Sequence, residues 1–223
     1  MGEVIVITSG KGGVGKTTTT ANIGAGLTRF DKKVAVIDTD LGLRNLDVVM
    51  GLENLIVYNL VDVIEGNCRL KQALIKDKRY ENLYLLPSAQ TKDKTAISPG
   101  QMKKLTAEMK EEFDFIPLDC PAGIEQLDLV INRIRMDMVK RGDMMSVDDV
   151  TEILSIPLIG AISDDEHVVI GTNQGEPVIG LDSKAGQAYL NICKRIMGVE
   201  VPFMDLESSS GLLSKLTHLF KKD

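Results

Sequence analysis

Short apolar runs alternate with longer stretches of helical spacing along this chain. Buried strands are predicted at residues 4–7, 33–38, 82–87, 113–119, 127–134 and 157–162. Helices are predicted at residues 17–27, 59–64, 70–75, 99–112 and 183–197, and residues 168–173 are expected to start a loop and a helix. This alternation predicts a three-layer α/β/α fold, in which helices cover both faces of a mostly parallel central sheet.

The connection between the fourth and fifth predicted strands is too short for this pattern. Only a few residues separate Asp119 from Leu127, whereas two neighbouring parallel strands need a crossover of about a dozen residues or more. Pro117 lies within the fourth predicted strand, where a proline removes a ladder hydrogen bond. The order of the strands after Gln126 is therefore left open.

Composition narrows the class of protein. With 223 residues and 43% hydrophobic content the chain can bury one sizeable core, so a single soluble domain is the default. A net charge of −6 and a pI near 5.1 argue against nucleic acid as a partner. Cys68, Cys120 and Cys193 include no CxxC pair, which predicts reduced thiols. No signal peptide or bilayer-length apolar run is visible, so a cytoplasmic protein is expected.

The most informative motif is a phosphate-binding loop. Residues 10–17, GKGGVGKT, satisfy the pattern GxxxxGK[ST] between a predicted strand and a predicted helix. Lys16 is expected to reach the β- and γ-phosphates of ATP, and the Thr17 hydroxyl is expected to bind Mg²⁺. The residues predicted to bind the nucleotide in this loop are Gly10, Lys11, Gly12, Gly13, Val14, Gly15, Lys16, Thr17 and Thr18.

Lys11 adds a second ammonium group to the loop. It is poorly placed for the phosphates of its own subunit, so we expect it to neutralise charge across a dimer interface, in the manner of an arginine finger. This predicts a homodimer that encloses ATP, with catalytic roles for both Lys11 and Lys16. The alternative is a solvated loop lysine.

Acidic residues at strand ends complete the predicted site. Asp38 and Asp40 follow the second predicted strand, and Asp119 ends the fourth, at the edge where open α/β sheets bind ligands. Asp38 and Asp119 are assigned to the Mg²⁺ side, and Asp40 is assigned to the attacking water. The segments at 41–47 and 120–123 resemble switches that sense the γ-phosphate.

The C-terminus predicts a membrane anchor. Its apolar residues recur on one helical stripe flanked by lysines, as in helices that lie in a membrane interface. One such tail would bind anionic lipid weakly, and two tails held by a dimer would bind well. We therefore divide the chain into an ATPase domain (1–206), a flexible tether (207–211) and an amphipathic helix (212–223). The membrane residues are Leu212, Leu213, Lys215, Leu216, Leu219 and Phe220.

These motifs resemble the deviant Walker A ATPases, and within them the branch that places the division site. The match rests on KGGVGKTT at 11–18, DTDLGLRNLD at 38–47, PAGIE at 121–125, VINR at 130–133, RGDM at 141–144 and NQGEP at 173–177. The resemblance implies an ATP-dependent dimer on the cytoplasmic face of the inner membrane. Its implied partners are a division inhibitor and a topological-specificity partner that stimulates hydrolysis, and Asn132 is implied to contact the adenine.

The chain departs from this family after Gln126. Family members carry a helix, a strand and a further helix there, so one unit of about 30 to 45 residues is expected to be missing, which would expose apolar sheet edges. Cys120 and Ser163 also stand where the family has serine and, usually, proline.

Three functions stay open at this stage. The first is a membrane-cycling ATPase that places the division septum. The second is a catalytically impaired nucleotide-binding or lipid-associated interaction protein. The third is a partition-type ATPase that acts on DNA, against which the acidic composition and the amphipathic tail both count.

Overall fold

A computed structural model describes residues 2–9, 11–40, 45–89, 97–121, 128–154 and 156–206. The strands are β1 (Glu3–Ile7), β2 (Val34–Asp38), β3 (Ile75–Lys76), β4 (Leu83–Leu86), β5 (Phe115–Asp119), β6 (Leu129–Ile134) and β7 (Leu158–Ser163). The helices are α1 (Lys16–Thr28), α2 (Leu46–Val49), α3 (Leu60–Ile64), α4 (Leu70–Ala73), α5 (Pro99–Met109), α6 (Met136–Arg141), α7 (Val147–Leu154), α8 (Glu166–Asn173) and α9 (Lys184–Ile196), with 3-10 turns at Glu53–Leu55 and Val178–Gly180.

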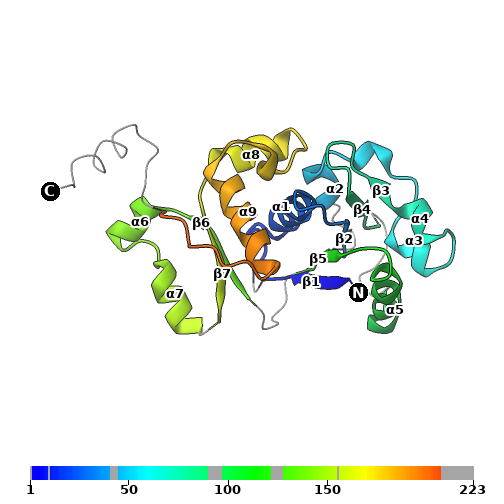
Figure 1. The fold of residues 1–223 in the computed structure, drawn as a ribbon, viewed down its shortest axis with the longest axis horizontal. Helices are drawn as coiled ribbons and strands as arrows, with labels where there is room; N and C mark the ends of the chain where they lie inside the picture. Colours follow the sequence, from blue (N-terminus) through cyan, green and yellow to red (C-terminus); the bar gives the residue numbers. More distant parts are fainter. Residues whose placement is uncertain are drawn as a thin grey trace.

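Five strands form the main sheet in the order β1-β5-β2-β4-β3. All its pairings are parallel except that of β3 with β4. Alternate residues of β2 face opposite cores: Val34 and Val36 pack with α1 and α9, whereas Ala35 and Ile37 pack with α3, α4 and α5. Helices therefore cover both faces of the sheet, as Figure 1 shows, and the predicted three-layer, mostly parallel fold is confirmed.

The last two strands stand apart from the main sheet. β6 and β7 form a separate parallel pair, and within the described residues β1 pairs only with β5 and β6 only with β7. Val4 to Ile7 of β1 are only half-buried, whereas every residue of β2 and β5 is buried. The sheet is thus divided at the point where the sequence lacks a crossover, and β1 and β6 are open edges.

A shared layer of helices keeps the two sheets together. α9 packs on β7 on one side and on α1 on the other, and the fully buried Tyr189 of α9 places its hydroxyl 3.2 Å from that of Thr19 in α1. Gly26 allows this close approach, because a Cβ atom there would lie 2.6 Å from the Cys193 sulfur. Ile5 of β1 and Val130 of β6 pack against the same cluster, which makes one core across the gap.

Several predicted elements differ from the structure. The predicted helix at 70–75 ends at Ala73, because Ile75 and Lys76 pair with β4 as a short antiparallel strand. Residues 168–173 are not a loop but lie inside α8, which Asp165 caps by accepting a hydrogen bond from the His167 amide. Helices α6 and α7 were not predicted, and neither contains a fully buried residue among those described.

Pro117 occupies the middle of β5, between β1 and β2. The amide of Phe115 points to β2 (Lys33 carbonyl, 3.4 Å), and that of Cys120 points to β1 (Ile7 carbonyl, 3.0 Å). Since amides alternate along a strand, the nitrogen of residue 117 faces β2 near the carbonyl of Ala35. Proline has no N–H to donate there, and the recorded pairing of β2 with β5 skips this position. A central strand therefore lacks one ladder bond.

Pro117→Val is expected to stabilise the protein by about 1 kcal/mol, because it restores a buried donor at nearly the same side-chain volume. Urea unfolding measures the change. Pro202→Val is the matched control, since Pro202 is exposed and lies outside the sheets, so that its replacement changes only the entropy of the unfolded chain. An equal or smaller unfolding free energy for Pro117→Val than for the control would contradict the missing ladder bond.

Candidate nucleotide site

The phosphate loop leads directly into α1. Gly13 and Gly15 have φ angles of +76° and +95°, a left-handed conformation that glycine adopts without steric cost. Gly15 is the N-cap residue of α1 and supplies no side-chain cap to the first amides of the helix. Free amides at a helix N-terminus, together with the helix dipole, form an anion site. The loop is therefore built to receive phosphate oxygens.

Lys16 is held over this loop by a residue that the sequence did not single out. Its ammonium donates to the Ser9 hydroxyl at 3.1 Å, and that hydroxyl donates to the Lys11 carbonyl at 2.6 Å. Ser9 follows β1, so a polar residue just before the loop was the available signal. The Lys11 side chain is exposed, as a residue that reaches another subunit must be.

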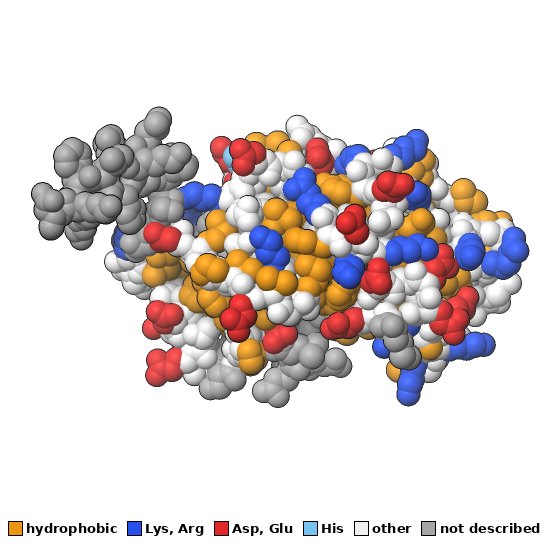
Figure 2. Space-filling view, in the orientation of Figure 1, with side chains coloured by type: hydrophobic (Ala, Val, Ile, Leu, Met, Phe, Trp, Pro, Cys, Tyr) orange, Lys and Arg blue, Asp and Glu red, His pale blue; other side chains and the backbone are white. Residues whose placement is uncertain are grey.

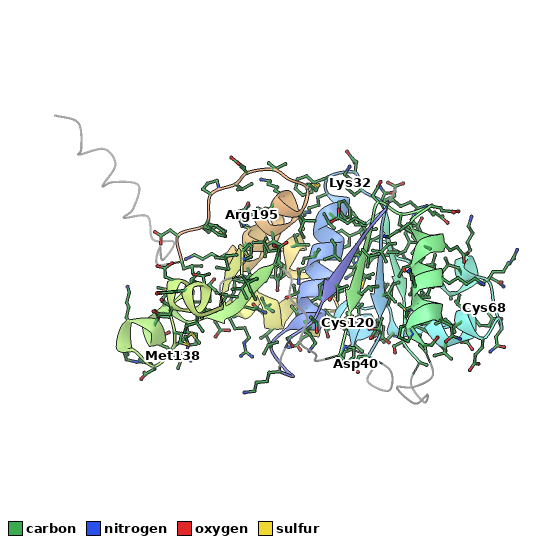
Figure 3. All side chains as sticks on the ribbon, turned by 90° about the horizontal axis from the view of Figure 1, so that it is seen from below. Lys32, Asp40, Cys68, Cys120, Met138 and Arg195 are labelled. Atoms are coloured by element: carbon green, nitrogen blue, oxygen red, sulfur yellow. The ribbon has the colours of Figure 1, made fainter. Side chains whose placement is uncertain are left out.

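Strand pairing brings the predicted acids together. Asp38 and Asp119 end neighbouring parallel strands in the same register, and both side chains are buried. The Asp38 carboxylate accepts hydrogen bonds from the amides of Asp40 (2.9 Å) and Leu46 (3.4 Å), so it also holds the start of α2. Figure 3 shows Asp40 and Cys120 at this carboxyl end of the sheet and Lys32 at the opposite end.

Ser88 is a further residue that the sequence reasoning missed. It is buried just after β4, and its hydroxyl donates to the Asp40 carbonyl at 3.2 Å. It thereby fixes the backbone that carries the predicted water-positioning carboxylate. A small polar residue directly after a buried strand was the only sequence signal for this contact.

Burial disfavours the ionised form of both carboxyl groups at the strand ends. Burial, together with the negative charge of the nearby Asp119, raises the pKa of Asp38 to about 7, against the hydrogen bonds from the amides of Asp40 and Leu46. Burial likewise raises the pKa of Asp119 to about 6, against the hydrogen bond from the Thr17 hydroxyl and the positive charge of Lys16. A cation placed between these groups would favour their ionised forms.

The donor set suits Mg²⁺. Buried Oδ1 atoms of Asp40 and Asp119 have no hydrogen-bond partner within the described residues. The Thr17 hydroxyl adjoins Asp119. In the described part of the chain, no three or more His, Cys, Asp or Glu side chains are arranged so that they alone could hold a metal ion. Few oxygen ligands completed by phosphate and water are what Mg²⁺ prefers.

Asn132 lies beside the phosphate loop. Its side-chain amide donates to the Val14 carbonyl at 3.2 Å, from β6 in the second sheet. The adenine contact implied for Asn132 stays a prediction. This hydrogen bond connects the separate strand pair to the phosphate loop.

Other predicted residues lie outside the described residues. They are Gly10, most of the first switch (41–44), half of the second (122–123), the tether, and the membrane residues Leu212, Leu213, Lys215, Leu216, Leu219 and Phe220. The helices that are described include none with the length and apolar content to span a bilayer.

Comparison with known proteins gives consistent matches. The sequence profile of the family described as CobQ/CobB/MinD/ParA nucleotide binding domain matches residues 5–178. The septum site-determining protein MinD of Bacillus subtilis is 47% identical over 99% of this chain and 98% of its own length, and that of Synechocystis sp. is 42% identical over 96% of each.

Solved structures agree with this result. The MinC:MinD cell division protein complex of Aquifex aeolicus matches with a TM-score of 0.82 and 39% identity, over 91% of this chain and 98% of that chain. The septum site-determining protein MinD of Pyrococcus horikoshii, complexed with Mg-ADP, matches with a TM-score of 0.75 and 26% identity, over 88% of this chain and 96% of that chain.

The alignment with the Bacillus subtilis protein also gives a minimum number of its positions that have no counterpart in this chain. It runs over 265 positions, which exceeds the 223 residues of this chain by 42, so at least 42 positions have no counterpart here. That number agrees with one missing helix–strand–helix unit and with the divided sheet. The predicted family resemblance is confirmed: the chain belongs to the CobQ/CobB/MinD/ParA family of nucleotide-binding domains and is similar over nearly its whole length to septum site-determining MinD proteins.

Proposed function

We propose that this protein binds and hydrolyses ATP with Mg²⁺ and uses the nucleotide to control its attachment to the membrane during placement of the division septum. The observation that carries the proposal is the pair of buried carboxyls of Asp38 and Asp119, which end neighbouring strands in one register at the edge of the sheet where α1 begins. Carboxylates in this position beside a phosphate loop support a Mg²⁺ site. Relatives named septum site-determining MinD support the biological role.

The residues of the site divide the chemistry among them. The loop amides and Lys16 bind the phosphate oxygens and stabilise the charge that develops on them during transfer. Thr17, Asp38 and Asp119 would hold Mg²⁺, which neutralises phosphate charge when bound. Asp40 lies at the same sheet edge and would orient the attacking water, with its backbone fixed by Ser88. Lys11 would act on the nucleotide of a second subunit.

The dimer connects the nucleotide to the membrane. Two C-terminal helices, held together by ATP, would bind an anionic surface that one helix binds weakly. The protein would thus alternate between the cytoplasm and the cytoplasmic face of the inner membrane. A structural neighbour is a MinC:MinD complex, which supports a division inhibitor as a partner; a topological-specificity protein that stimulates hydrolysis completes the proposed cycle.

The divided sheet favours a second candidate function. A chain that lacks a central unit but keeps its phosphate loop could bind nucleotide or lipid without forming a productive dimer. Vesicle binding and hydrolysis separate the two candidates.

Wild-type protein is expected to sediment with anionic phospholipid vesicles in ATP and Mg²⁺ but not in ADP and Mg²⁺, because only ATP holds two tails together. Leu216→Glu should abolish sedimentation and leave ATP binding intact, since it puts a charge into the apolar stripe. Equal sedimentation in both nucleotides would contradict the cycling ATPase and favour the impaired lipid-associated protein.

Lys11→Ala is expected to lower the rate of ATP hydrolysis by about 10²- to 10³-fold, as removal of one charge-stabilising donor does. Its affinity for ATP should change little, because Lys11 acts across the interface. Lys32→Ala, at the opposite end of the sheet, is the matched control. A steady-state phosphate-release assay and a fluorescent-ATP titration measure the two quantities; a loss of affinity equal to the loss of rate would contradict action in trans.

The stability of the protein without nucleotide or Mg²⁺ is expected to fall as pH rises from 5 to 8. Both raised pKa values lie above the ordinary value of 3.8, so the folded protein holds protons that the unfolded chain has lost. This contribution is complete below about pH 4 and is lost as pH passes through the folded pKa values of about 6 and 7, by several kcal/mol, since each unit of raised pKa corresponds to about 1.4 kcal/mol.

Denaturant unfolding at several pH values, with and without Mg²⁺ and ADP, measures this dependence. Asp119→Asn should reduce it, because Asp38 is then the only one of the two carboxyls left to ionise, and bound Mg²⁺ should reverse it. An unchanged slope for Asp119→Asn would show that other groups cause the dependence.

A further inference from the structure

The pairing of strand β6 is irregular near Asn132, and this irregularity sets the direction of the Asn132 side chain. The pairing of β6 with β7 shifts register between Ile131 and Ile134. Arg133, within this interval, has φ +60°, one of only two non-glycine residues with positive φ among those described. A bulge of this kind turns a side chain away from its regular direction, and bulges recur next to active sites.

The bulge also fixes how the Asn132 amide is oriented. The Arg133 amide donates to the Asn132 Oδ1 atom at 2.9 Å, and only an oxygen can accept that bond. The Nδ2 atom must therefore point the other way, where it donates to the Val14 carbonyl at 3.2 Å. Gly15 makes room for it, because a Cβ atom on Gly15 would lie 2.5 Å from this nitrogen.

The bond to Val14 constrains the peptide that follows. In a trans peptide the carbonyl of Val14 and the N–H of Gly15 point in opposite directions. A Val14 carbonyl held toward β6 therefore turns the Gly15 N–H away from β6, which leaves it available to a phosphate bound in the loop. Successive amides turned inward make the concave site that binds an anion.

We propose that Asn132 is a positioning residue for phosphate binding, which holds the Val14–Gly15 peptide with its N–H toward the phosphates. This inference rests on the proposed nucleotide binding and deepens it. A residue that orients the loop affects every ligand with the same phosphate chain equally, whereas a residue that reads adenine affects ATP alone. The separate β6–β7 pair thereby contributes to the phosphate site across the gap in the sheet.

Asn132→Ala tests the proposal with three ligands that share a triphosphate: ATP, GTP and inorganic tripolyphosphate, titrated calorimetrically with Mg²⁺. Affinity is expected to fall by the same factor for all three, about three- to tenfold, as for the loss of one neutral hydrogen bond. Asn132→Asp should lose more, again equally, because a carboxylate repels both the carbonyl and the phosphates. Arg133→Lys, which keeps the charge and the backbone amide, is the matched control and should bind as wild type.

A loss confined to ATP, with GTP and tripolyphosphate bound as by wild type, would overturn the proposal and assign Asn132 to the base. A second measurement needs no ligand. Amide hydrogen exchange of residues 12–16 in the free protein should speed up in Asn132→Ala and not in Arg133→Lys. Unchanged exchange in Asn132→Ala would overturn the proposal even if the wild-type protein bound none of the three ligands, a result that would separately refute the proposed function.

Discussion

The packing of α1 against α9 is the contact on which the rest of this structure depends. α1 lies over the main sheet and begins at the phosphate loop, while α9 lies over the β6–β7 pair. Buried Thr19, Tyr189, Gly26 and Cys193 bring the two helices close together. No backbone ladder joins the two sheets within the described residues, so this side-chain contact holds them in one body. Figure 2 shows hydrophobic side chains gathered on the surface over this junction.

The same arrangement makes it costly to ionise the two buried carboxyls when no cation is bound. Neighbouring parallel strands end with Asp38 and Asp119 in one register, under a helix N-terminus that repels cations and attracts anions. Two buried carboxyls without a cation are costly, which is why their pKa values are raised to about 7 and about 6. A site of this kind stays incomplete until a phosphate and a divalent cation arrive together. Binding of the pair would relieve the cost of burial that the free protein carries.

The nucleotide site keeps contacts with both sheets although the sheets are separate. Asn132 reaches from β6 to the phosphate loop, and Asp38 holds the first turn of α2 through the Leu46 amide. At the other end of α2, Arg79 donates to the carbonyls of Met50 and Gly175, where Gly51 and Gly175 are in close contact. Both halves of the molecule therefore meet the nucleotide site through a small number of specific contacts rather than through a continuous sheet.

The sequence alone determined the fold class, the phosphate loop, the acids at the strand ends and the missing crossover. These follow from local patterns: apolar runs, the spacing of glycines with a lysine and a threonine, and the length of one connection. The roles of Ser9 and Ser88, the strand at Ile75–Lys76 and the position of Asn132 were decided by the tertiary structure. Each depends on a partner that no local spacing identifies, such as Lys16, Asp40, Tyr84 or Val14. Local sequence patterns identify the functional side chains of a chain, but tertiary packing determines which of them come into contact.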